Sequence, residues 1–254
     1  MKQVLTIAYN TYLETIRDRI LYVFVAFAIA MIGISIIMGS ISLNQDTKII
    51  KDFGLAGMFF FGVLIAVFVG ANTIHKEKDK RTIYIILSKP IRHWQFILGK
   101  FLGLALSLLV VTLLMSIIFL TITTIKEKSF SFLLLEAIFF QYLELILLIS
   151  VVIAFSSFTS PLSAAIYTIC LFIIGHSTTV INQIAAKSQN IFISKSLETV
   201  YYIFPNLEKF NLKTNVVYGI GYNGPETIIA ILYGLFYIGL MLTLATQILK
   251  KQEF

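Results

Sequence analysis

Charged residues are scarce in this chain, and their scarcity excludes a water-soluble fold. Only 13% of the 254 residues are charged, whereas 58% are hydrophobic, and the mean hydropathy is +0.89. Soluble domains contain about 25% charged and about 45–50% apolar residues. A soluble fold of this composition would leave far too much apolar surface in water. We therefore expect an all-α membrane protein whose solvent is the lipid bilayer.

The residues and motifs of enzymes and metal centres are also nearly absent. Cys170 is the only cysteine, so no disulfide can form within the chain. The three histidines, His75, His93 and His176, show no ligand spacing and have no cysteine pair beside them. No phosphate-binding loop, zinc-protease helix or serine-hydrolase elbow occurs. We expect no catalytic residue and no metal site in this chain.

Six apolar runs are long enough to cross the membrane. About 20 apolar residues are needed to span about 30 Å of hydrocarbon. Residues 1–254 therefore form a single transmembrane domain, and the six predicted spans are Ile20–Leu43, Phe53–Ile74, Phe96–Ile125, Phe132–Phe155, Leu162–Ile181 and Thr227–Leu249.

The distribution of basic residues predicts the orientation. Seven of the 20 Lys and Arg residues fall between His75 and Lys100, after the second span. Basic residues in short loops face the cytoplasm. We expect this loop and both termini to be cytoplasmic and the protein to lie in the inner cell membrane. The net charge of +7 is then explained by orientation, and no nucleic acid partner is expected.

The segments outside the spans differ in character. Residues 1–19 have apolar side chains at helical spacing, which predicts an amphipathic helix in the membrane interface. Asn44–Asp52 is interpreted as a short link, and Pro161 is well placed as the first residue of the fifth span. Residues 182–226 form the sizeable outer segment, in which Ile193–Phe204 predicts a short surface helix ended by a proline.

Polar side chains within the spans are the candidates for a transport pathway. Glu144 lies about 12 residues into the fourth span, near mid-membrane, and Gln141 is on the same helical face. A carboxylate at that depth costs several kcal/mol unless it is paired or hydrated. Glu144 is therefore interpreted either as a functional group or as a hydrogen-bonded residue that holds helices together. His176, near the outer end of the fifth span, has the same two interpretations.

The basic loop after the second span, residues 75–95, is the strongest candidate for a protein contact. The apolar run Ile83–Leu87 would serve no purpose in a mere charge anchor. It predicts a short helix on the membrane surface, which Pro90 ends before the next span. The alternative is a basic loop that sets the orientation and binds no partner.

Several motifs resemble one family of transport proteins. The cytoplasmic loop carries Glu77, Thr82, Lys89-Pro90, Arg92 and Gly99-Lys100, and later motifs are Ser156–Pro161, Gly175-His176 and Phe204–Asn211. In this order and spacing they resemble the permease subunits of type-2 ATP-binding-cassette (ABC) exporters. The branch that includes multicopper-enzyme maturation permeases is the most similar. Arg81 stands where the family usually has glycine.

The resemblance implies a non-catalytic exporter subunit that works as a pair of copies. Each copy would dock a cytosolic ATPase, which binds the ATP and Mg²⁺, while this chain binds no cofactor. It also implies that short outer helices precede the last span. The residues expected to couple to the ATPase are Glu77, Arg81, Thr82, Lys89, Pro90, Arg92 and Trp94.

Two other functions stay open at this point. One is an ion- or proton-coupled secondary carrier that uses Glu144. The other is a membrane scaffold for the maturation of an extracytoplasmic enzyme, with the partner bound on residues 182–226. The transported substrate is not predicted by the sequence.

Overall fold

The protein is built of long helices that run back and forth across one bundle. The structure is a computed structural model and describes residues 2–41, 46–79, 92–188, 190–213, 216, 221 and 224–251. Within these residues all regular structure is helical. In this described part of the chain, six helices are long and apolar enough to cross a membrane, which confirms the predicted all-α membrane fold. They are α2 (Arg19–Ile41), α3 (Asp46–Asp79), α5 (His93–Glu127), α6 (Phe132–Ser156), α7 (Pro161–Lys187) and α10 (Gly224–Lys251).

The helices extend beyond several of the predicted spans. Each span lies within one helix, apart from residues 42–43, which are outside the described part of the chain. The link predicted over Asn44–Asp52 is wrong from Asp46 onward, because α3 already begins there. An aspartate in the first turn favours a helix start, and Lys51 forms an ion pair of 2.6 Å with Glu127 of α5. Pro161 does open α7, as predicted.

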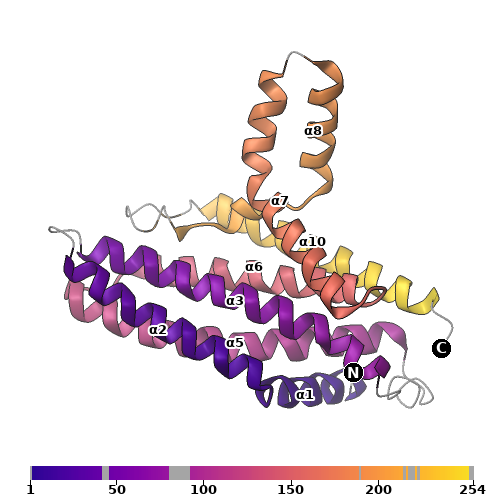
Figure 1. Cartoon of the computed structure of the whole chain (residues 1–254), viewed down its shortest axis with the longest axis horizontal. Coiled ribbons are helices and arrows are strands. Elements are labelled where there is room, and N and C mark those ends of the chain that lie inside the picture. The colour runs from indigo at the N-terminus through magenta and orange to yellow at the C-terminus, as the bar shows by residue number, and fades with distance from the viewer. Residues whose placement is uncertain are drawn as a thin grey trace.

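Helices α3 and α6 form the centre of the bundle. Figure 1 shows α2, α3, α5 and α6 lying side by side. In α3 and in α6, 67% of the most apolar stretch is buried, compared with 22% in α2 and in α10. Since lipid is as apolar as leucine, close packing and hydrogen bonds hold such helices together. The exposed apolar sides of α2 and α10 are therefore surfaces for lipid or for another membrane protein.

Between α7 and α10, the described residues contain two further helices. The predicted surface helix is observed as α8 (Ile191–Ile203), which Asn190 caps by accepting a hydrogen bond from the backbone N–H of Phe192. Figure 1 shows the second half of α7 and α8 projecting from the bundle as a hairpin. The short helix η1 (Leu207–Phe210) then returns to the bundle, where Leu207 and Phe210 are fully buried. The segment predicted to lie outside the membrane therefore enters the protein core with η1 instead of only covering it.

The predicted amphipathic N-terminal helix is observed as α1 (Lys2–Ile16). It packs lengthwise on α5 through small and polar residues: Val4, Ala8, Thr11 and Thr15 are buried. Its large apolar residues Leu5 and Tyr9 are 65% and 60% exposed.

Two glycines of α5 make this packing close. A Cβ atom on Gly103 would lie 2.6 Å from the carbonyl oxygen of Ala8, and one on Gly99 would lie 3.2 Å from that of Val4. The two glycines thus allow α1 to pack closely on α5, as small residues do wherever membrane helices approach closely. The apolar side of α1 stays free for the membrane interface that the sequence predicts for it.

Candidate functional site

Gln141 and Glu144 share a face of α6 but make different contacts. The side-chain amide of Gln141 donates a hydrogen bond of 2.8 Å to the backbone carbonyl of Leu55 on α3. This contact joins two central helices, and it occupies the Gln141 side chain in the bundle core. The structure therefore supports a structural role for Gln141 and separates it from the polar groups around Glu144.

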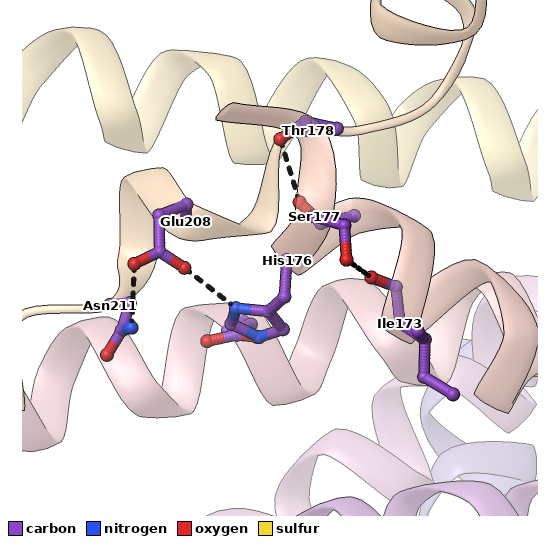
Figure 2. Close-up of polar contacts among 8 residues, drawn as sticks. Ile173, His176, Ser177, Thr178, Glu208 and Asn211 are labelled. Carbon is purple, nitrogen blue, oxygen red and sulfur yellow. Dashed lines mark hydrogen bonds and ion pairs between the residues drawn. The ribbon is translucent and has the colours of Figure 1, made fainter. Parts of the chain in front are cut away.

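Glu144 is the buried end of a chain of three titratable groups. Its side chain is fully buried, and its Oε1 atom lies 2.7 Å from Nε2 of His176 on α7. The other ring nitrogen, Nδ1, lies 3.0 Å from Oε2 of Glu208 on η1. Figure 2 shows Glu208 between His176 and Asn211, whose amide donates a hydrogen bond of 2.9 Å to Glu208 Oε1. One imidazole thus links α6, α7 and the outer segment.

The three hydrogen-bonded groups together hold one proton more than a neutral imidazole and two carboxylates would hold. Carboxylates only accept hydrogen bonds, and a neutral imidazole has a single N–H. Both ring nitrogens of His176 face a carboxyl oxygen. Either the imidazole is doubly protonated or one carboxyl group is protonated. The hydrogen bond from His176 keeps the pKa of the Glu208 carboxyl below its ordinary value, although partial burial opposes this.

Lys213 brings a positive charge to the same place. Its Nζ atom lies 3.2 Å from the ring centroid of Phe59 on α3, where the electron-rich ring face attracts a cation. Burial lowers the pKa of the Lys213 ammonium to about 8, although nearby carboxylates oppose this shift, namely Glu144, Glu208 and Asp52. We call Glu144, His176, Glu208, Asn211 and Lys213 the polar cluster.

The polar cluster forms because the outer segment packs tightly into the bundle. A Cβ atom on Gly175 would lie 2.7 Å from Cγ of Leu207, so glycine beside His176 lets η1 approach α7. Phe210 packs against Phe140 of α6 at a ring-centroid distance of 6.5 Å. The hydroxyl of Tyr233 on α10 accepts a hydrogen bond of 2.7 Å from the backbone N–H of Asn206. Three spans therefore hold the segment that carries Glu208 and Lys213.

A second group of charges lies where α1, α3 and α5 meet. The Nζ atom of Lys100 is 2.8 Å from Oε1 of Glu77 and 3.8 Å from Oε2 of Glu14. Lys76 forms an ion pair of 2.9 Å with Asp18, which follows α1. Burial raises the pKa of the Asp18 carboxyl, but its hydrogen bonds and the charge of Lys76 outweigh this, so the net pKa is lowered. We call these five residues the charged junction.

The charged junction flanks the loop that is predicted to contact the ATPase. Of the predicted coupling residues, Glu77 forms the buried ion pair with Lys100, while Arg92 and Trp94 are exposed at the start of α5. Arg81, Thr82, Lys89 and Pro90, with the apolar run between them, lie outside the described residues.

Comparison with known proteins decides the family. A family model described as "ABC-2 family transporter protein" matches residues 3–254. The chain belongs to this family. It is thus a multi-pass membrane permease of an ABC transporter, and ABC-2 permeases are typically non-catalytic subunits that work with a cytosolic ABC ATPase. The predicted family is confirmed, and the multicopper-enzyme branch stays a prediction. No curated protein matches the chain.

Glu208, Lys213 and Lys100 of this ABC-2 permease make contacts in the structure but were not among the candidate site residues chosen from its sequence. Glu208 and Lys100 were named only within motifs of the family resemblance, and Lys213 only as part of the outer segment 182–226. The signal for the two residues of the outer segment is their spacing among Leu207, Phe210 and Leu212, all of which are buried. The signal for Lys100 is its position inside the apolar run of α5, where its side chain is only 3% exposed.

Proposed function

We propose that this ABC-2 permease is the membrane subunit of an exporter in which two identical copies pair. A separate cytosolic ATPase binds ATP and Mg²⁺ and supplies the energy, and the permease itself carries no cofactor. The chain lies in the inner cell membrane with both termini cytoplasmic. Figure 1 places α1 and the last turns of α10 at the same end of the bundle, which agrees with an even number of spans.

The charged junction is the observation that carries the coupling role. The ATPase contact is proposed for the segment from Glu77 to Trp94, with Arg81, Thr82, Lys89, Pro90 and Arg92 as the contact residues. This segment connects α3 to α5. The ion pairs of Lys100 and Lys76 tie α3 and α5 to α1 and to the start of α2. A push on the segment would therefore move α3 and α5 together with α1, because the buried ion pair of Lys100 does not break without a large cost, whereas the exposed pair of Lys76 adds little.

Co-expression with the ATPase tests this contact. The variants Arg81→Ala, Arg92→Ala and Trp94→Ala should reduce the ATPase recovered with the tagged permease and the ATPase activity of the complex. Lys126→Ala is the matched control, since Lys126 is exposed at the opposite end of α5. Unchanged recovery and activity in all three variants would place the contact elsewhere.

A secondary carrier is the second candidate, and the polar cluster is the observation that favours it. Glu144 and His176 connect the core of the bundle to Glu208, whose side chain is 38% exposed. Such a chain of titratable groups is typical of proton relays. Proteoliposomes that contain the permease alone decide between the two functions. A proton-driven carrier transports without ATPase and stops in Glu144→Gln, whereas the exporter subunit is inactive without its ATPase.

An extracytoplasmic partner is proposed for the α7–α8 hairpin. Phe192 and Tyr202 of α8 are 81% and 77% exposed, and exposed apolar residues of this size mark interaction surfaces when they gather. Double substitution of both by serine should leave the ATPase complex intact and reduce recovery of an outer protein. If no outer protein is captured by either form, the scaffold role is wrong.

A further inference from the structure

An open apolar groove runs between α3 and α7. Its volume is about 570 Å³, within the range of about 300–1,000 Å³ typical of small-molecule sites. At the surface, Phe60 and Ile173 are 59% and 57% exposed, so the groove opens on the outside of the bundle. Eight of its nine lining residues are apolar and one is charged: Ala56, Phe59, Phe60, Val63, Leu64, Ile169, Phe172, Ile173 and Lys213.

The charge that this groove presents is positive. Lys213 lines the groove, and among the described residues its ammonium group is seated only on the ring of Phe59. The carboxylates of the polar cluster are engaged elsewhere: Glu144 is fully buried, and both Glu144 and Glu208 contact His176. The groove therefore combines apolar walls with one cation in its lining.

We propose that the groove between α3 and α7 binds a lipid of the surrounding bilayer, with an acyl chain along the apolar walls and an anionic headgroup paired with Lys213. An acyl chain can fill the groove because its walls are as apolar as the lipid hydrocarbon around them. An anionic headgroup would pair with the ammonium group of Lys213, whereas this ammonium group would repel a cationic headgroup. Binding of this lipid does not depend on the proposed function. A role of the lipid as the exported substrate would rest on that function.

Lipid binding to the purified full-length permease tests the proposal. In neutral detergent, native mass spectrometry measures the Kd of phosphatidylglycerol, which is anionic, and of phosphatidylcholine, which has no net charge. We expect phosphatidylglycerol to bind at least about tenfold more tightly, and inorganic phosphate alone not to compete. Lys213→Met should abolish this preference and Lys213→Arg should keep it. Lys209→Met is the matched control, because the Lys209 ammonium lies over the Tyr233 ring, 4.2 Å from its centroid, away from the groove.

Two further measurements test the same proposal without the Lys213→Met variant. Ile173→Trp narrows the groove and should weaken the binding of both lipids. Wild-type protein at pH 9.5 should lose the preference without any substitution, so the test does not depend on the folding of Lys213→Met. In that range Lys213 loses its proton. The carboxyl groups that act on Lys213 are those of Asp52 on α3, Glu144 on α6 and Glu208 on η1, and His176 on α7 contacts the last two.

Three results would overturn the proposal. The first is an unchanged preference in Lys213→Met, and the second is equal binding of the two lipids to the wild type. The third is that Ile173→Trp changes the proportion of dimers while phosphatidylglycerol binding persists, which would assign the groove to a second copy of the chain. None of these measurements uses the ATPase, so failure here is distinct from failure of the coupling contact.

Discussion

Removing the Glu77 carboxylate should destabilise the protein more than removing the Lys100 ammonium that it pairs with. The Lys100 side chain is 3% exposed and that of Glu77 is 17% exposed. Glu77→Gln leaves a buried ammonium without its nearest counter-charge, and such a change costs about 3–5 kcal/mol. Glu14 stays 3.8 Å from Lys100 and offsets part of this, so we expect a loss of about 3 kcal/mol.

The reverse substitution should be milder. Lys100→Met leaves Glu77 partly accessible to water, so we expect a loss of about 1 kcal/mol, and the double variant should be no worse than this. The interaction energy of this cycle is then about 3 kcal/mol. Lys76→Met is the control: the Lys76 side chain is 40% exposed, and exposed ion pairs contribute about 0–1 kcal/mol.

Unfolding in mixed detergent–SDS micelles measures these free energies. The chain has one tryptophan, Trp94 at the start of α5, and its fluorescence reports on this end of the bundle. Two results would refute the idea that the buried ion pair holds α3 and α5 together. One is a loss below about 0.5 kcal/mol in Glu77→Gln. The other is a loss of stability in the double variant that equals the sum of the losses in the single variants.

Three further predictions concern other parts of the molecule. Gly103→Ala should cost about 1–3 kcal/mol by forcing α1 away from α5, whereas Gly239→Ala, where a Cβ atom meets nothing within 4 Å, should be neutral; thermal unfolding compares them. The preference for anionic lipid should fall as the pH rises through about 8, the pKa of Lys213, because the charged form of Lys213 is lost. In Lys213→Arg the preference should persist to above pH 10, since arginine keeps its proton. Identical pH profiles of the two proteins would contradict this. Glu144→Gln should destabilise the protein by about 1–3 kcal/mol, because a buried hydrogen-bond network is broken, yet leave ATPase-driven export in place; loss of all export with normal folding would instead assign Glu144 to the transport pathway.

Much of the fold follows from local sequence patterns. Runs of about 20 apolar residues must become helices in a bilayer, because lipid offers no hydrogen bonds to the backbone. Pro161 fits the start of a helix because its missing N–H is not needed there. The periodicity before Pro205 correctly predicted α8 for a similar local reason. These features depend on neighbours a few residues away.

The contacts that build the candidate site depend on residues far apart in the chain, and only the tertiary structure decided them. The sequence alone singled out Glu144 and His176 as polar groups in apolar spans. It contained no signal that Glu208 would contact His176, 32 residues away, or that Lys213 would rest on Phe59. Those contacts exist because Gly175 lets the outer segment enter the bundle. In the same way, the apolar pattern of α1 predicted a helix but not its packed face, since the glycines of α5 favour the side with the smallest side chains.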